Sequence, residues 1–366
     1  MGDNPPRSVD ASAGGPGGNT RAAGVAASTD GLTDNLSGGG RGTPSGGRGQ
    51  GGGGALPRAK AFGTEPAFRG LTLAAGTMVL IIIVAIAIFL ITEAIPALQA
   101  NEANFLTYRD WGATASPPRF GIAAIVYGTV LSAVIALLVA VPIALGIALF
   151  LSHYAPRRIA TTLGFIIDLL AAVPSVVFGL WGRAVFIEPV RDFSVWLNKY
   201  FGWIPLFGGE GPYGNSILLG SLVLAIMILP IVTSLSREVF MQTPKQNEEA
   251  ALALGATKWE MIRTAVLPYG RPGVIAAVML GLGRALGETI ALAMTLGSLY
   301  VITPDIITNG GVTIASNIAN RFGEATEIGR GALIASGLVL FAITLVVNMI
   351  ARIIIYRRRE FTDVAA

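Results

Sequence analysis

Two residues of opposite charge, Arg284 and Glu288, lie in the largely apolar segment 281–297, "GLGRALGETIALAMTLG". Each charge costs roughly 2.5–3.5 kcal/mol at the centre of a bilayer, so ionisable residues in such segments usually face an interior or a water-filled path. Residues four apart share one face of a helix, and we expect these two to pair. The planar donors of arginine suit phosphate oxygens. The pattern therefore favours an anion path, and a structural ion pair that joins two helices is the alternative.

The segment 160–185 carries further residues that could serve an anion. Pro174 removes a backbone donor, and we expect it to break or kink the helix near its middle. A half-helix that begins there would direct its N–H groups and the Ser175 hydroxyl at an anion, although a simple proline kink is the alternative. Asp168 lies in the cytoplasmic half of this segment, where it either sits near the interface or pairs with Arg284 or another base.

Membrane-spanning helices must position these residues. The chain is 52% hydrophobic and 13% charged, whereas an ordinary soluble protein is about one quarter charged. About 20 helical residues cross the hydrocarbon core of a bilayer. Six apolar stretches reach that length, namely 70–95, 119–152, 160–185, 214–236, 272–303 and 330–355. We therefore predict an all-α polytopic membrane protein, with six transmembrane helices in the domain 66–366.

The distribution of basic residues predicts the orientation, because Lys and Arg collect in cytoplasmic loops. An N-terminus inside the cell places Arg157, Arg158, the basic residues of 237–271 and the closing "YRRRE" in the cytoplasm. We predict that both termini are cytoplasmic. The Gly-, Ser- and Arg-rich segment 1–65 has almost no large apolar residues, so we predict a disordered cytoplasmic tail.

The composition also excludes several functions. The chain has no cysteine and one histidine, His153, so we expect no metal site and no catalytic residues. The 26 basic residues exceed the 22 acidic ones by too little to suggest nucleic-acid binding. No lysine follows a glycine, so the chain lacks a P-loop. We expect this chain to have no cofactor and not to hydrolyse ATP.

The cytoplasmic loop 243–268 predicts an elbow of two short helices. Thr243 can cap the first helix, and Gly255 can adopt the left-handed conformation that ends it. Thr257 and Glu260 have the spacing of a capping box that starts the second helix, and we expect Pro268 to end it. An amphipathic connector lying on the membrane surface is the alternative.

This loop, "EAALALGATKWEMIRTAVLP", resembles the EAA loop of ATP-binding-cassette importer permeases. The matching residues are Glu249, Ala250, Ala251, Gly255, Leu267 and Pro268, whereas Ala265 stands where the pattern has isoleucine. The resemblance implies the fold of a type I importer permease. It also implies a coupling helix that docks on a separate ATPase subunit, where ATP and magnesium are expected.

Two intramembrane stretches, "GRALGETIALA" and "DLLAAVPSVVFGLWG" (168–182), resemble the phosphate (Pst-type) permeases, and the second is more similar to PstC than to PstA subunits. The resemblance covers roughly residues 70–356. It implies the transmembrane subunit of a phosphate importer in the bacterial inner membrane, in contact with membrane lipid. The implied partners are a PstA-like permease, a PstB-like ATPase dimer and an external PstS-like phosphate-binding protein.

Three alternatives remain open. The permease could serve another oxyanion, such as sulfate or molybdate. A secondary transporter or channel could use Arg284 and Glu288 as an ion or proton relay, and it would continue to work without ATP. The chain could also be a membrane scaffold that transports nothing; co-purification with an ATPase would argue against both of the last two.

Overall fold

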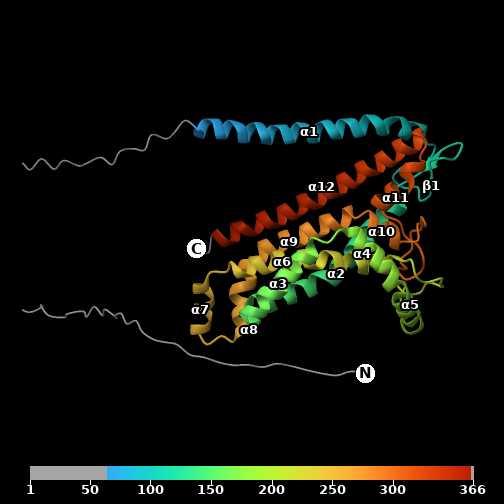
Figure 1. Cartoon of the computed structure of the whole chain (residues 1–366). Coiled ribbons are helices and arrows are strands. Elements are labelled where there is room, and N and C mark those ends of the chain that lie inside the picture. The colour runs from blue at the N-terminus through green and yellow to red at the C-terminus, as the bar shows by residue number, and fades with distance from the viewer. Residues whose placement is uncertain (1–63, 364–366) are drawn as a thin grey trace, which may run out of the picture. The chain divides into compact units, whose positions relative to one another are not determined.

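The computed structural model describes the backbone of residues 64–363 and the side chains of residues 68–353. The predicted disordered tail therefore lies almost entirely outside the described residues. The described part is helical apart from loops and one short hairpin (Figure 1). Its longer helices are α1 (Thr64–Ala100), α2 (Ala123–Leu149), α3 (Arg157–Ala171), α5 (Ile187–Phe201), α6 (Ile217–Met241), α9 (Leu267–Gly287) and α12 (Glu327–Asp363).

Shorter elements join these helices. They are α4 (Ser175–Trp181), α7 (Lys245–Ala253), α8 (Lys258–Met261), α10 (Ile290–Thr295), α11 (Ile314–Arg321), a 3-10 turn (Phe322–Glu324) and three π-helical turns, Phe150–Tyr154, Gly182–Phe186 and Ile262–Val266. The strands β1 (Trp111–Gly112) and β2 (Arg119–Phe120) pair antiparallel, with Trp111 opposite Phe120. This hairpin covers a small apolar cluster that includes Ile314 and Leu333.

The centre of the bundle is the contact between α2 and α6. Ala133, Ala136 and Ala140 of α2 lie three or four residues apart and are fully buried on one helix face. Small side chains let two helices approach closely. The buried residues of α6, such as Leu219, Leu224 and Ile228, fill the same cluster. The tight pair α2–α6 is therefore the frame on which the other helices are placed.

The helix α1 contributes little to this core. It packs against α12, and its most apolar stretch exposes large side chains all around, with Leu80 62% and Phe89 61% exposed. Soluble proteins rarely expose so large a continuous apolar surface to water, whereas the hydrocarbon core of a membrane solvates it. Exposure of this kind fits a helix that is surrounded by lipid on most of its sides.

Five described helical segments are long and apolar enough to cross a membrane: Phe68–Ala100, Ala123–Tyr154, Ile217–Met241, Lys258–Gly287 and Glu327–Ile353. A sixth crossing exists if the broken pair Arg157–Ala171 and Ser175–Phe201 is counted as one span. The two parts of that pair are bent by 91°. The prediction of six spans therefore agrees with the structure in number, although one span is broken.

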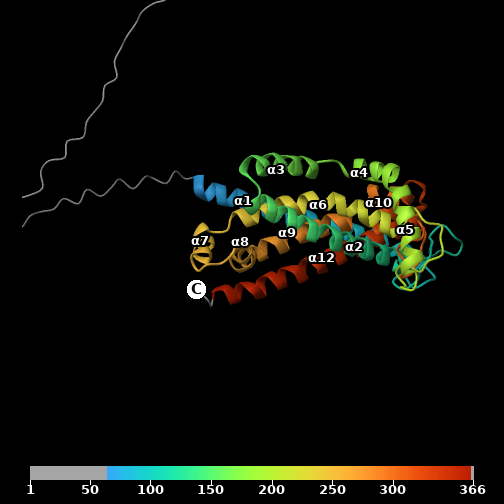
Figure 2. The same cartoon turned by 90° about the horizontal axis from the view of Figure 1, so that it is seen from below.

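The third predicted span, 160–185, is divided into two helices. The helix α3 ends at Ala171, and α4 begins at Ser175 with Pro174 at its N-cap. Because proline lacks the N–H that would continue the helix, the predicted break at Pro174 is confirmed. Beyond it the chain turns, and α5 runs across the long direction of α3 and α6 in both views (Figures 1 and 2).

The fifth predicted span, 272–303, is wrong at both ends. The helix begins at Lys258 and ends at Gly287. Pro268 does not end a helix, because the π-helical turn Ile262–Val266 precedes it and changes the local hydrogen-bond pattern, so that the chain continues directly into α9. Local π adjustments of this kind accommodate proline inside membrane helices.

Candidate functional site

The second helix of the elbow and the charged residue Arg284 belong to one uninterrupted helical segment, Lys258–Gly287. Its first turn has the predicted capping box. The Thr257 backbone N–H donates to the Glu260 carboxylate at 2.8 Å, and the Glu260 N–H donates to the Thr257 hydroxyl at 3.3 Å. Arg284 lies in the last turn of the same segment. The helix therefore connects the elbow to the interior of the bundle without a loop.

Arg284 and Glu288 do not form the predicted ion pair. Among the residues whose side chains are described, no Arg284–Glu288 contact lies within the 4.0 Å of an ion pair. The cause is the end of α9 at Gly287. Glu288 follows with extended backbone (φ −67, ψ 126), so the two residues no longer share one helix face. The expectation of an i, i+4 pair is wrong because the helix ends between them.

Glu288 has a different partner. Its side chain is buried, with 7% exposed, and its Oε1 accepts a hydrogen bond from the backbone N–H of Ala291 at 3.1 Å. The carboxylate thus satisfies a free donor in the first turn of α10. Negative charge is favourable at this end of a helix. Glu288 therefore positions α10 against the end of α9.

Arg284 faces a groove of about 1180 Å³ between α6, α9 and α12. The groove is mostly apolar, with Ile231, Leu280 and Leu345 among its lining residues. Its other polar groups are Asn348 and Arg352 of α12. Among the described side chains, no carboxylate lies within ion-pair distance of either arginine. A groove with two unpaired cations and apolar walls is suited to an anion.

Asn348 and Arg352 were not predicted from the sequence. They lie four residues apart within the apolar stretch 330–355, and with Leu345 and Met349 they occupy one face of α12. The spacing i, i+3, i+4, i+7 defines such a face. The same reasoning that selected Arg284 could have selected this pair of polar residues.

The residues predicted in the third span lie on other faces. Asp168 of α3 is exposed, and its Oδ1 accepts a hydrogen bond from the Ser234 hydroxyl of α6. The alternative in which Asp168 pairs with Arg284 is not realised among the described side chains. The guanidinium of Arg237 lies over Gly164 at the same α3–α6 contact. The structure does not bring Asp168 into the groove that Arg284 lines.

Pro174 and Ser175 start α4, which packs against α10. A side-chain carbon built on Gly179 would lie 2.6 Å from the Cα of Ala291, so the two backbones are in close contact. Arg183 Nη1 donates to the Met294 carbonyl at 3.2 Å. These two contacts hold α4 and the π-helical turn that follows it against α10.

The elbow has the predicted left-handed glycine. Gly255 adopts φ +85, and α7 ends just before it. Leu254 and Trp259 flank the turn and are 90% and 56% exposed. Ile262 is fully buried inside the chain, so it does not contribute to the exposed surface of the elbow. The exposed surface of the elbow consists of its tip rather than its whole apolar side.

Individual residues of the elbow differ from their expected roles. Thr243 does not cap α7, because Pro244 is the N-cap and the Thr243 hydroxyl is buried without a partner in the described structure. Glu249 and Ala250 are exposed, whereas Ala251 and Leu267 pack against a cluster that includes Phe240. Of the residues that match the EAA loop, Glu249 and Ala250 therefore face outward, and Ala251 and Leu267 face the interior.

Two contacts attach the elbow to the end of α2. The Nε2 atom of His153 lies 3.5 Å from Oε1 of Glu248 on α7, and the His153 side chain is 7% exposed. The Lys258 ammonium lies 4.8 Å from the centre of the Tyr154 ring, a distance at which cation–π attraction operates. These contacts connect α7 and α8 to the π-helical turn Phe150–Tyr154.

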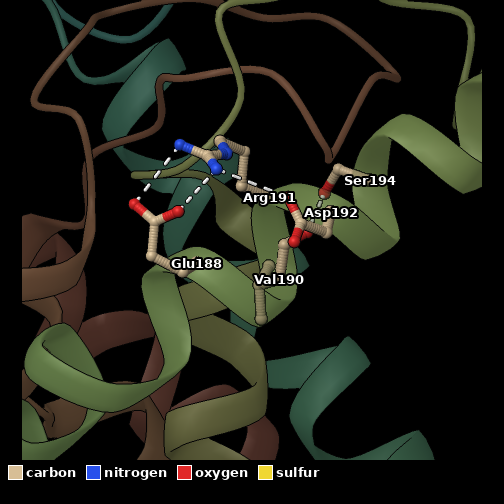
Figure 3. Close-up of polar contacts among 5 residues, drawn as sticks. All are labelled: Glu188, Val190, Arg191, Asp192 and Ser194. Atoms are coloured by element: carbon tan, nitrogen blue, oxygen red, sulfur yellow. Dashed lines mark hydrogen bonds and ion pairs between the residues drawn. The ribbon is translucent and has the colours of Figure 1, made fainter.

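At the opposite end of the bundle, charged side chains of α5 pair with one another (Figure 3). Arg191 lies between Glu188 and Asp192, with its Nη2 3.5 Å from the Asp192 carboxylate. The Ser194 hydroxyl donates to the Val190 carbonyl at 2.7 Å. These charges are exposed on α5 and do not line the groove.

The sequence is similar to known proteins over most of its length. Residues 140–360 match the family described as "Binding-protein-dependent transport system inner membrane component". The chain is 48% identical over 309 residues to the phosphate transport system permease protein PstC 2 of Mycobacterium tuberculosis, covering 81% of this chain and 95% of that one. It is 42% identical over 294 residues to PstC of Xylella fastidiosa, covering 79% and 90% of the two chains. With PstC of Mycobacterium leprae the identity is 48% over 273 residues, which cover 73% and 86%.

Proposed function

The chain belongs to the family of binding-protein-dependent transport system inner membrane components, and we propose that it is a PstC-type subunit that forms part of a translocation path for inorganic phosphate. It is a transport subunit, and ATP is hydrolysed by a separate subunit. The observation that carries the choice of path is the groove between α6, α9 and α12, where Arg284 is available to an anion.

Arg284 is the principal phosphate contact in this proposal. Its guanidinium can donate two parallel hydrogen bonds to one phosphate. Since no carboxylate competes for it among the described residues, the anion meets a free donor group. Glu288 acts as a positioning residue that caps α10. Pro174 and Ser175 act similarly by starting α4 beside it, and Asp168 stabilises the α3–α6 contact through Ser234.

The elbow residues Glu249, Ala250, Ala251, Gly255, Leu267 and Pro268 form the proposed coupling site. The family implies an ATPase and an external substrate-binding protein as partners. We propose more specifically a PstA-like permease, a PstB-like ATPase dimer that carries ATP and magnesium, and a PstS-like binding protein. The exposed tip at Leu254 and Trp259 offers the apolar groups that would enter a groove of the ATPase.

The chain is an inner-membrane component, and we propose that both of its termini are cytoplasmic. Because the chain has no cysteine, single cysteines report the orientation without background. Trp203→Cys, at a position that is 80% exposed, should react with an impermeant thiol reagent outside the cell. Gln246→Cys on α7 should react only after the membrane is opened. Reaction of both in intact cells would contradict this orientation.

Phosphate uptake by the reconstituted importer tests the function. Arg284→Gln should nearly abolish ATP-dependent uptake per assembled complex, while Arg284→Lys should retain part of it because the charge remains. Uptake by Arg284→Gln near the wild-type value would remove Arg284 from the path. Stronger uptake of sulfate or molybdate would identify another oxyanion as the substrate, and uptake without ATP would indicate a secondary transporter or channel.

A further inference from the structure

The α12 side of the groove carries a polar pair that the proposed function has not used, Asn348 and Arg352. Both residues are exposed in the chain, and the groove positions around them, Leu345 and Met349, are apolar. In a membrane-spanning helix, an arginine and an asparagine on one face require polar partners. Among the described side chains Arg352 has no ion-pair partner.

The directions of the two helices fix the order of the two arginines. The helix α9 leads away from the elbow, and α12 leads back toward the end where α7 lies (Figures 1 and 2). The α9 residues of the groove run from Ala276 to Arg284, and those of α12 from Leu345 to Arg352. In this antiparallel arrangement Arg352 is opposite the Ala276 end. At 1.5 Å per residue, Arg352 lies about 10 Å nearer the elbow than Arg284.

Arg284, Asn348 and Arg352 thus follow one another along the same groove toward the elbow. Resting on the proposed function, we propose that Asn348 and Arg352 form a second phosphate-binding position on the elbow side of Arg284. An anion that leaves Arg284 meets the Asn348 amide and then the Arg352 guanidinium. Two moderate positions in series permit both entry and release, which a single tight site would not.

Charge complementarity selects inorganic phosphate as the occupant. The groove combines two cations and an amide, and its other lining residues, such as Ile231 and Leu280, offer no negative charge. The phosphate of a lipid headgroup could also bind the Arg352 guanidinium, because it carries the same charged oxygens. However, the groove continues about 10 Å further to Arg284, and a path of this length suits a small anion that moves along it.

The absence of cysteine from the chain allows a test that does not depend on transport. Met349→Cys places a reporter inside the groove, and Ile350→Cys is the matched control outside it, since both positions are 52% exposed. In the assembled complex, in vesicles of zwitterionic lipid, an anionic thiol reagent should modify Cys at 349 several-fold faster than a cationic one. Arg352→Gln in that background should remove most of this preference, and position 350 should show neither effect.

Inorganic phosphate should slow the modification at position 349, and Arg352→Gln should weaken this protection several-fold while Arg352→Lys retains it in part. Protection by anionic lipid alone would overturn the proposal in favour of a headgroup site. Absence of both protection and reagent preference would also overturn it, and would indicate that a partner chain neutralises Arg352. Because the labelling requires no uptake, a normal uptake by Arg284→Gln would refute the proposed path separately.

Discussion

The carboxylate of Glu288 accepts a hydrogen bond from the backbone N–H of Ala291 at 3.1 Å and so joins the end of α9 to the start of α10. Glu288, four positions after Arg284 in sequence, therefore binds the backbone of α10 rather than Arg284. Arg284 remains free for the groove between α6, α9 and α12. The two charges in this segment are therefore separated: Glu288 binds the backbone of α10, and Arg284 lines the groove.

We expect Glu288→Gln to be mild and Glu288→Ala to be damaging. The glutamine amide oxygen can still accept from Ala291, whereas alanine removes the acceptor at a cost of about 1 kcal/mol, as for other helix caps. Thermal unfolding of the purified complex, together with uptake per complex, measures both. If the exchange Arg284→Glu with Glu288→Arg restored transport, the two residues would act as an ion pair and this assignment would be wrong.

Gly179→Ala should destabilise the contact between α4 and α10. The added carbon would lie 2.6 Å from the Cα of Ala291, and overpacking of this kind costs about 1–3 kcal/mol. Gly146→Ala is the matched control, because nothing lies within 4 Å of the corresponding carbon on α2. We expect lower thermal stability and slower uptake for the first variant only. Equal behaviour of the two variants would show that the close approach is not required.

Gly255→Val should impair coupling while leaving membrane insertion normal. At φ +85 a β-branched residue costs roughly 1–2 kcal/mol in backbone strain, which would displace α7 relative to α8. Phosphate-stimulated ATP hydrolysis should fall, and Gly255→Asn should retain more of it because asparagine tolerates this conformation. Normal transport by Gly255→Val would remove the elbow from the mechanism.

The His153–Glu248 contact predicts a change in efficiency. Glu248→Ala removes a partner 3.5 Å from Nε2 of His153 and should loosen α7 from the end of α2. ATP hydrolysis should then continue while less phosphate is transported for each ATP consumed, by roughly a factor of two to five if about 0.5–1 kcal/mol of attachment is lost. Glu238→Ala, on the exposed end of α6, serves as the control. An unchanged ratio of phosphate to ATP would contradict the role of this contact.

Features that depend on a few adjacent residues were predictable from the sequence. The break at Pro174, the positive φ of Gly255 and the capping box of Thr257 and Glu260 all occur as predicted. Each of these is decided by local backbone preferences and by donors within three residues. The class of a helical membrane protein was also predictable, because the length and the apolar composition of each stretch are properties of the sequence itself.

Features that depend on contacts between helices were not predictable in this way. Arg284 and Glu288 could pair only if α9 continued past Gly287. The helix α9 instead ends at Gly287, and the following helix α10 packs against α4. Pro268 was expected to end a helix, but a π-helical turn with buried Ile262 and Val266 precedes it. The sequence pattern of α12 could single out Arg352, but that Arg352 lines the same groove as Arg284 depends on the packing of α12 against α9.

The uninterrupted helix Lys258–Gly287 has a mechanical consequence. Arg284 lies 26 positions after Lys258, which corresponds to about 39 Å along the helix, so a tilt of about 5° around the elbow would move Arg284 by about 3 Å. A displacement of that size exceeds the tolerance of a hydrogen bond. On the proposed path, a small rotation imposed on the elbow would therefore be enough to make or break a hydrogen bond between the Arg284 guanidinium and an anion, with the helix serving as a lever arm.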